Sequence, residues 1–355
     1  MSTPTPLHDC FYSMVKLAVV RLFVERHVFL AIPPDGISIT ELSHRVNIDR
    51  NLLIRLSNFL LAAGVLTPTS TSATSQLVSV SPGYAAFQDP RATLMYSYVF
   101  DSFLGSTIKW PEYFNKNGFR EPQSATASPF GLAAGCPYKS FYEVLETLPE
   151  RAAAFNSTMA IALGEMAITG IYDFSWVAEY ATLSDRVLIV DVGGGKGQAL
   201  RAILEEISAI PASRCVLQDQ AAVIQQAAAE IGDDDALKEV QMVPNSFFDE
   251  QPTKGALVYY IRRVLNDWSD AECVTILRQI RSACAGDSRV LISENLLPEQ
   301  PSLAIAGVDL FLMNIGGKRR SEGMFAELAS EAGFKIQSIS RGANSDDAVI
   351  EMVLA

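Results

Sequence analysis

The segment from Val187 to Gly197 constrains the fold more than any other part of the chain. It reads Val-Leu-Ile-Val-Asp-Val-Gly-Gly-Gly-Lys-Gly, an apolar run that leads directly into a glycine loop. Glycine has no Cβ, so the backbone can turn sharply here and approach a ligand closely. A helix is expected from Gln198 to Ile207. A strand, a glycine loop and a helix in this order are typical of a nucleotide-like ligand site at the carboxyl edge of a parallel sheet. An ordinary strand–turn–helix is the alternative.

The details of the loop exclude two kinds of nucleotide site. No Gly-Lys-Ser or Gly-Lys-Thr follows the strand, so the loop is not a phosphate-binding P-loop. The glycines are contiguous and follow an Asp at the strand's end, unlike the spaced glycines of a dinucleotide fold.

Strands and helices alternate after this loop. Amphipathic helices are expected over Ala271–Ala285 and Ser321–Ala332. The last two strands have no helix between them and are expected to form a hairpin with an antiparallel strand. The pattern predicts an α/β fold with a doubly wound sheet. Strands are expected at Arg214–Gln218, Glu239–Val243, Gly255–Tyr260, Ser288–Glu294, Lys335–Ser340 and Ala348–Val353.

The N-terminal part has a different pattern. Leu7 to Ile32 reads as one amphipathic helix, apolar on more than one side, and such a helix in a small domain predicts a homodimer. Residues 37–81 read as a winged helix. Its helices are expected at Ser38–Val46 and Leu52–Ala63, and its wing strand at Gln76–Ser81.

Charge and composition exclude several functions. The net charge is −12, which disfavours nucleic-acid and anionic-membrane binding, and the second helix of the winged-helix pattern carries only Arg50 and Arg55. No apolar run reaches bilayer length and no leader precedes the first helix, so a cytoplasmic protein is expected. The five cysteines are scattered without metal-ligand spacing, which predicts reduced thiols and no metal site.

Several residues after the loop fit a nucleoside ligand. Asp219 ends the second strand, where an acid can bind a ribose diol, although it could equally cap the following helix. Ser246 and Phe247 follow the third strand and could flank an adenine, and Arg262 follows the fourth.

These segments together resemble the plant and fungal small-molecule O-methyltransferases, a class I S-adenosylmethionine (SAM) family. The resemblance rests on the glycine loop, Asp219, residues 245–248, 259–270 and 292–294, and Gly-Gly-Lys-Arg-Arg-Ser-Glu at 316–322. It implies a Rossmann-like SAM domain over 151–355, after an all-helical, winged-helix-like dimerisation and substrate-pocket domain over 1–150. The implied SAM contacts are Gly193, Gly195, Asp219, Ser246, Phe247 and Arg262, with Trp268 and Met159 nearby.

The catalytic residues depart from the family pattern. The family's general base is the His of a His-Asp-Trp tripeptide, and this chain has Asn266-Asp267-Trp268 instead. Asn has no group that titrates near neutral pH. The three histidines, His8, His27 and His44, all lie in the N-terminal part. Of the two acids that brace the family's His, Glu294 supplies one. The other position holds Arg319, or Lys318 or Arg320 if the register slips, and all three are basic.

This combination resembles the O-methyltransferase-like pericyclases of fungal natural-product pathways. It predicts that SAM, or S-adenosylhomocysteine, is retained without being consumed. A polyketide-like substrate would then undergo Diels–Alder, hetero-Diels–Alder, Alder-ene or retro-Claisen chemistry, or dehydration. Asn266, Lys318 or Arg319 could donate to a substrate carbonyl, with Asp267 orienting the donor. Phe103, Trp110, Phe311 and Met313 could shape the cavity.

Three alternatives stay open. A working O-methyltransferase would need a phenolic or polyketide hydroxyl acidic enough to ionise unaided, such as a naphthol-like or tetramic-acid hydroxyl. A catalytically dead scaffold partner and a SAM-assisted hydroxylase or decarboxylase are the others.

Overall fold

The computed structural model describes residues 5–69, 77–164, 167–231, 236–343 and 345–355. Contacts divide the chain into two units. The N-terminal unit comprises residues 1–104 and 148–163, and the sheet unit comprises residues 105–147 and 164–355. The chain thus enters the sheet unit, returns to the N-terminal unit for one helix, and then completes the sheet. The division at residue 150 into two functional domains stays a prediction.

The N-terminal unit combines helices with a small sheet. Its three short antiparallel strands lie in the order β1-β3-β2, so the expectation of an all-helical domain is wrong at this point. The strand β3, Leu77-Val-Ser-Val80, lies within the wing strand that the sequence predicts. The elements are α1 (Pro6–Glu25), α2 (Val28–Ala31), β1 (Ile37–Ser38), α3 (Ile39–Val46), α4 (Arg50–Ala62), β2 (Leu66–Pro68), β3 (Leu77–Val80), η1 (Pro82–Gln88), α5 (Pro90–Val99), the π-helix η2 (Phe100–Leu104) and α10 (Pro149–Gly164), of which residues as far as 163 belong to this unit.

The single helix expected from Leu7 to Ile32 is interrupted. The first helix, α1, ends at Glu25, and His27 adopts a left-handed backbone conformation with φ of 53° before α2 begins. The break allows Phe23 and Phe29 to pack with ring centroids 5.4 Å apart in the core of this unit. Burial of these rings therefore outweighs the cost of one left-handed residue.

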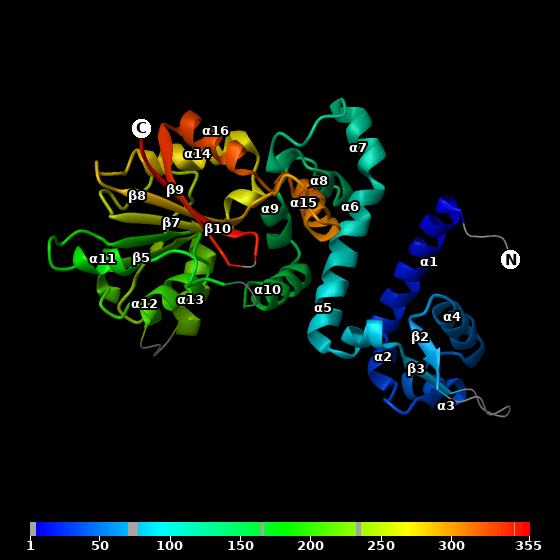
Figure 1. The fold of residues 1–355 in the computed structure, drawn as a ribbon. Helices are drawn as coiled ribbons and strands as arrows, with labels where there is room; N and C mark the ends of the chain where they lie inside the picture. Colours follow the sequence, from blue (N-terminus) through cyan, green and yellow to red (C-terminus); the bar gives the residue numbers. More distant parts are fainter. Residues whose placement is uncertain (1–4, 70–76, 165–166, 232–235, 344) are drawn as a thin grey trace. The chain divides into compact units, whose positions relative to one another are not determined.

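The sheet unit is built on seven strands (Figure 1). The strand order is β6-β5-β4-β7-β8-β10-β9. The first five strands in this order are parallel, whereas β10 pairs antiparallel with both β8 and β9, which confirms the predicted hairpin. The strands are β4 (Ile189–Val192), β5 (Cys215–Asp219), β6 (Gln241–Pro244), β7 (Val258–Arg262), β8 (Arg289–Asn295), β9 (Phe334–Arg341) and β10 (Asp347–Leu354).

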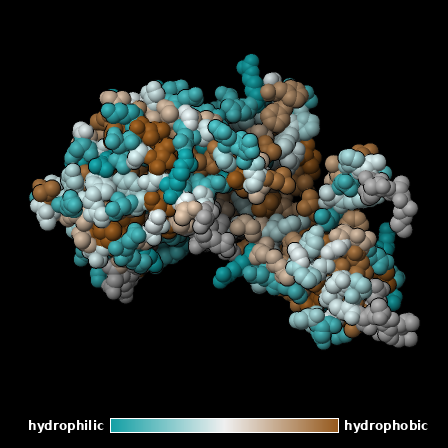
Figure 2. Space-filling view, viewed as in Figure 1, coloured by the Kyte–Doolittle hydropathy of each residue, from teal (hydrophilic) through white to brown (hydrophobic). Residues whose placement is uncertain are grey.

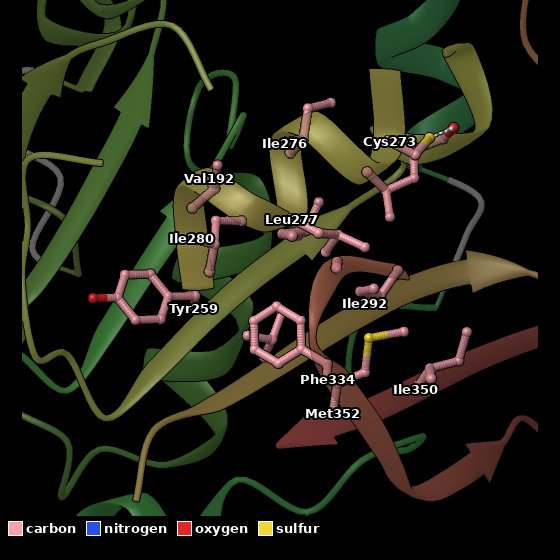
Figure 3. Close-up of a cluster of buried hydrophobic side chains, with 14 of the residues drawn as sticks. Val192, Tyr259, Cys273, Ile276, Leu277, Ile280, Ile292, Phe334, Ile350 and Met352 are labelled. Atoms are coloured by element: carbon pink, nitrogen blue, oxygen red, sulfur yellow. Dashed lines mark hydrogen bonds between the residues drawn. The ribbon is translucent and has the colours of Figure 1, made fainter. Parts of the chain in front are cut away.

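Helices cover both faces of this sheet. One face packs on α14 (Asp270–Arg281) and α16 (Glu322–Ala332), and the other on α11 (Ser175–Glu179), α12 (Gln198–Glu206) and α13 (Ala221–Ile231). Successive strand residues point to opposite faces. Tyr259 and Ile292 therefore join the first core (Figure 3), and Tyr260 and Leu291 join the second. The sheet is buried on both sides, as in other parallel sheets.

The remaining elements of the sheet unit are short helices and α15 (Leu303–Ile315). Helix α15 packs against α8 (Pro129–Ala133). Glu272 on α14 accepts hydrogen bonds from the Ser124 hydroxyl at 3.0 Å and the Ala125 N–H at 3.1 Å, which ties residues 124–125 to the sheet. The other elements are α6 (Gly105–Ile108), α7 (Trp110–Asn117), η3 (Ala125–Ala127), α9 (Phe141–Glu146), η4 (Ala212–Arg214) and η5 (Leu265–Asp267).

Hydrophobic residues gather in several patches among hydrophilic ones on the visible surface (Figure 2). Among the described residues, no helix has the length and apolar character needed to cross a bilayer.

Candidate active site

The glycine loop connects β4 to α12 through a turn that excludes side chains. Gly193, Gly195 and Gly197 have φ of 71°, 59° and 80°, a region that glycine adopts without strain. A Cβ on Gly194 would lie 2.5 Å from Asp191 Oδ2, and one on Gly193 would lie 2.8 Å from Val264. The loop therefore presents bare backbone, as a cradle for a ligand requires.

Asp219 meets this loop from the end of β5. Its Oδ2 accepts a hydrogen bond of 2.9 Å from the Gly195 N–H, and its Oδ1 accepts one of 2.7 Å from the Gln220 N–H. The two donors hold the carboxylate beside the loop, while burial raises its pKa. The structure thus brings together two of the residues that the sequence assigned to a nucleoside ligand.

Asp191, which the sequence reasoning did not assign to the site, lies beneath the loop. Its side chain is fully buried, and neither oxygen meets hydrogen-bond geometry with a described residue. Burial raises the pKa of Asp191 to about 7. The Arg262 guanidinium lowers this pKa, the Asp219 carboxylate raises it, and the nearby Leu200 N–H lowers it. Its position at the strand end, before Gly193, was the signal that could have identified it.

Aromatic side chains border the loop. Phe247 lies 3.6 Å from the position that a Cβ on Gly193 would occupy, and its ring centroid is 5.7 Å from that of Trp268. The Trp268 ring in turn stacks with Tyr142 at 6.1 Å. Ser246, by contrast, uses its hydroxyl to accept the N–H of Phe248 at 3.2 Å.

The Glu294 carboxylate lies next to the Asn266 backbone. The carboxylate is 3% exposed, and its Oε1 accepts the backbone N–H of Asn266 at 3.3 Å. Burial raises its pKa to about 7, opposed chiefly by Arg263, whose Nη1 lies 3.8 Å from Oε2. Sequence reasoning missed Arg263, which follows β7 with a left-handed φ of 58°. No periodic pattern marks such a residue.

Asn266 and Asp267 are joined to each other and to a distant tyrosine. The Asn266 Nδ2 donates to Asp267 Oδ1 at 2.9 Å, and the Tyr142 hydroxyl donates to Asp267 Oδ2 at 2.5 Å. Burial raises the Asp267 pKa to about 6, and the Tyr142 hydrogen bond and the Arg263 charge partly oppose this rise. Tyr142 lies on α9, which the sequence did not connect with the site.

The three basic residues after α15 have different surroundings. Lys318 pairs with Asp270 at 2.5 Å and Glu121 at 3.1 Å, although its backbone N–H donates to the Asn266 carbonyl at 2.9 Å. Arg320 is 1% exposed and lies against the backbone of residues 265–268.

Arg319 is half-buried among charged groups, although the cations that lower the Glu294 pKa are Arg263 and, more weakly, Arg320. The Arg319 charge interacts with Glu294 and is repelled by Arg263, so its pKa is lowered, first by burial and then by this repulsion. Its Nη1 lies 3.7 Å from Asp346, and its backbone N–H donates to Asp309 at 2.7 Å. That Arg319 occupies the place of the family's second acid stays a prediction.

A cavity of about 190 Å³ opens beside these basic residues. Met313 and Arg319 line it together with Asp309 and Glu121. Trp110 instead donates from its ring nitrogen to Asn314 at 2.8 Å, and Phe311 lies on α15 outside the lining. Phe103 on η2 and Met159 on α10 belong to the N-terminal unit, so their part in the site stays a prediction.

Comparison with known proteins identifies relatives along the whole chain. Methyltransferase fsa4 of Fusarium sp. (strain FN080326) is 59% identical over 98% of this chain and 96% of its own length. Methyltransferase eqxD of Fusarium heterosporum is 58% identical over the same shares.

Two solved structures have the same fold. OxaC in complex with sinefungin and meleagrin is 25% identical, with a TM-score of 0.85 over 99% of this chain and 89% of that chain. LepI in complex with SAM is 24% identical, with a TM-score of 0.78 over 99% and 90%, and this likeness shows the fold alone. The O-methyltransferase domain model matches residues 117–335. The chain therefore belongs to the O-methyltransferase family.

Proposed function

We propose that this protein is a SAM-dependent methyltransferase that acts on an acidic heteroatom of a small natural product. The observation that carries the proposal is the glycine loop, where side chains at Gly193 and Gly194 are excluded and Gly195 is bonded to Asp219. Relatives named methyltransferases that match nearly the whole chain support it. They outweigh the pericyclase resemblance, because a solved structure titled as a pericyclic reaction enzyme shares the fold at only 23% identity.

When bound, SAM supplies an electrophilic methyl group. The protein's residues hold and shield the reactants. Asp219 lies at the end of β5, where an acid can bind a ribose diol, and Phe247 and Trp268 supply apolar walls that exclude water. The buried Asp191 lies where a cationic group of the ligand would restore a partner for its carboxylate.

The chemistry follows from the residue at position 266, which is Asn. The Asn266 carboxamide cannot accept a proton, so the substrate nucleophile has to ionise before it is methylated. The Arg263 guanidinium acts on both Asp267 and Glu294, and Arg319 lines the neighbouring cavity, so both cations favour an anion there. A tetramic-acid hydroxyl meets this requirement at neutral pH, and a naphthol-like hydroxyl, a weaker acid, meets it increasingly as the pH rises.

A non-methylating cyclisation or dehydration is the second candidate. The observation that favours it is the same neutral amide, because hydrogen-bond donors beside a shaped cavity can lower a pericyclic barrier without a base. In that case SAM or S-adenosylhomocysteine would be retained unchanged.

One experiment separates the two. Purified protein is incubated with SAM and a panel of acceptors, and the product masses are measured by mass spectrometry. The panel contains 1-naphthol, a 3-acyl tetramic acid, a polyphenol and a polyene quinone methide. We expect a product heavier by one methyl group and an equal amount of S-adenosylhomocysteine. An isomer or dehydrated product with SAM unconsumed would establish the cyclase instead. An Asp219→Ala variant controls for methylation by a contaminating enzyme.

We further propose that the N-terminal unit, with its winged-helix-like order of α3, α4 and the β2–β3 hairpin, mediates a homodimer. Leu7, Phe11 and Met14 on α1 are 77%, 56% and 66% exposed, although α1 is buried in its second half. Light scattering at micromolar concentration should give twice the chain mass, and a Phe11→Glu, Met14→Glu double variant should give the monomer mass. A Lys16→Glu variant on the same helix is the matched control, and a monomeric wild type would overturn the proposal.

A further inference from the structure

A chain of two hydrogen bonds reaches Asn266 from outside the sheet. The Tyr142 hydroxyl on α9 donates to Asp267 Oδ2 at 2.5 Å, and the Asn266 Nδ2 donates to Asp267 Oδ1 at 2.9 Å. Both carboxylate oxygens of Asp267 are thereby used. Tyr142 is held in place because its ring stacks with Trp268, with centroids 6.1 Å apart.

This chain determines which way the Asn266 amide points. With Nδ2 directed at Asp267, the Asn266 Oδ1 is buried and has no hydrogen-bond partner among the described residues. A flipped amide would place this oxygen against the Asp267 carboxylate, and two acceptors repel each other. A buried acceptor without a donor is costly, so a donor supplied by a ligand would be bound strongly here.

The orientation depends on Asp267 being ionised. Three titratable or charged groups act on or face this carboxyl group, namely Tyr142 from α9, Arg263 from the end of β7 and Glu294 from β8. The Lys318 ammonium is directed instead to Asp270 and Glu121. Burial raises the Asp267 pKa to about 6, and the Tyr142 hydrogen bond lowers it. Tyr142 therefore helps to keep the acceptor charged at neutral pH.

We propose that Tyr142 and Asp267 are positioning residues that orient the Asn266 side chain so that its Oδ1 accepts a hydrogen bond from an O–H or N–H group of the bound substrate. This inference rests on the proposed function, since it assumes a small-molecule substrate at position 266. The methylated heteroatom arrives as an anion, so the donor is a second group of the same molecule. The substrate class is then an acidic compound with a hydrogen-bond donor beside its ionised oxygen.

The test compares two tyrosine variants in the sheet unit. Tyr142→Phe removes the hydroxyl that bonds Asp267 and keeps the ring. Tyr113→Phe is the matched control, because the Tyr113 hydroxyl is also engaged, at 2.6 Å, but with the Ala127 carbonyl, which does not titrate. The specificity constant kcat/KM is measured as a function of pH, with whichever acceptor of the panel yields S-adenosylhomocysteine.

The expected results follow from the protonation of Asp267. Wild-type activity should fall as the pH falls through about 6, where Asp267 takes up a proton. Loss of the Tyr142 donor should move this midpoint upward by about one pH unit, so that kcat/KM at pH 6 falls about fivefold while the rate at pH 8.5 changes little. Tyr113→Phe should keep the wild-type midpoint. Identical midpoints in wild type and Tyr142→Phe would overturn the proposal.

A second measurement needs no substrate. The side-chain amide of Asn266 is observed by NMR in protein labelled with ¹⁵N-asparagine and assigned by its loss in Asn266→Ala. Its signals should shift with an apparent pKa near 6 in wild type and in Tyr113→Phe, and at higher pH in Tyr142→Phe. If no acceptor gives S-adenosylhomocysteine, the proposed function fails while this titration still tests the orientation. An amide that does not respond to pH would disprove the orientation even if methylation occurs.

Discussion

Asn266 donates a hydrogen bond of 2.9 Å to Asp267, the residue that follows it. Its backbone N–H donates to Glu294 at 3.3 Å. The two acids around position 266 thus hold a neutral amide in place of a group that could remove a proton. Under the proposed function, the site positions a nucleophile, and the substrate has to supply the acidity.

Restoring a base at this position should widen the range of acceptors. In an Asn266→His variant, the imidazole can donate to Asp267 and accept a proton from the substrate. We expect kcat/KM for a weakly acidic acceptor such as 1-naphthol to rise about tenfold at pH 8, less than a fully supported general base contributes, because the sequence predicts Arg319 in place of the second acid. A 3-acyl tetramic acid, already ionised, should gain nothing. Asn266→Gln is the control, and an equal gain for both acceptors would contradict the idea.

The glycine loop should be intolerant of a single methyl group. In Gly194→Ala the added Cβ would lie 2.5 Å from Asp191 Oδ2 and 2.6 Å from Leu217 Cδ1, so the loop has to move. We expect the dissociation constant for S-adenosylhomocysteine, measured by calorimetry, to rise at least about tenfold, which corresponds to 1.4 kcal/mol. Gly286→Ala is the matched control, because nothing lies within 4 Å of its Cβ position. Unchanged binding in Gly194→Ala would remove the loop from the cofactor site.

Local patterns predicted the part of the site that lies next to them in sequence. The apolar run before Gly193 became β4, and Asp219 ended β5 beside the same loop because parallel strands deliver their carboxyl ends to one edge. The final hairpin followed equally from two apolar runs without a helix between them.

The rest depended on tertiary contacts that no local pattern contains. Tyr142 lies 125 residues before its partner Asp267. The break at His27 has no Gly or Pro to announce it, since the packing of Phe23 on Phe29 decides it. Sequence could not choose among the basic residues after Gly317 either. Only the buried contacts of Arg320 assign it to the framework.

Asp191 should make the ligand-free protein less stable as the pH rises. Its pKa is about 7 in the folded chain, above the ordinary value of 3.8. The folded state therefore holds a proton that the unfolded state has released, and stability falls between about pH 4 and pH 7. We expect Asp191→Asn to gain about 2–4 kcal/mol relative to wild type on going from pH 5 to pH 8 in urea unfolding, while losing affinity for SAM.

The matched control for this pH effect is Asp185→Asn, whose carboxyl group is exposed. It should leave the difference between the two pH values unchanged. If Asp191→Asn shows the same pH dependence as wild type, the buried carboxyl group is not the source of the instability.

Arg320 should be the most costly cation to remove from the sheet unit. It is 1% exposed and donates to the carbonyls of Leu265 and Trp268 at 2.7 Å each, and its Nε donates to Asp270 at 2.8 Å. Arg320→Ala removes the guanidinium donors from the Leu265 and Trp268 carbonyls, while Asp270 keeps Lys318, so we expect a loss of about 3–5 kcal/mol in urea unfolding. Arg320→Lys should recover only part of this, because one ammonium group cannot reach all three acceptors in the geometry of the guanidinium fork.

The exposed pair of Lys254 and Glu250 provides the comparison, since Lys254→Ala should cost less than about 1 kcal/mol. The backbone that Arg320 holds also carries Asn266 and Asp267. At temperatures well below its unfolding transition, the Arg320→Ala variant should therefore already have a lower kcat than wild type. The reason is that the segment that positions the substrate is released before the rest of the chain unfolds. If kcat stays at the wild-type level until global unfolding, residues 265–268 keep their geometry without Arg320, and the network around Asn266 is held from the Tyr142 side alone.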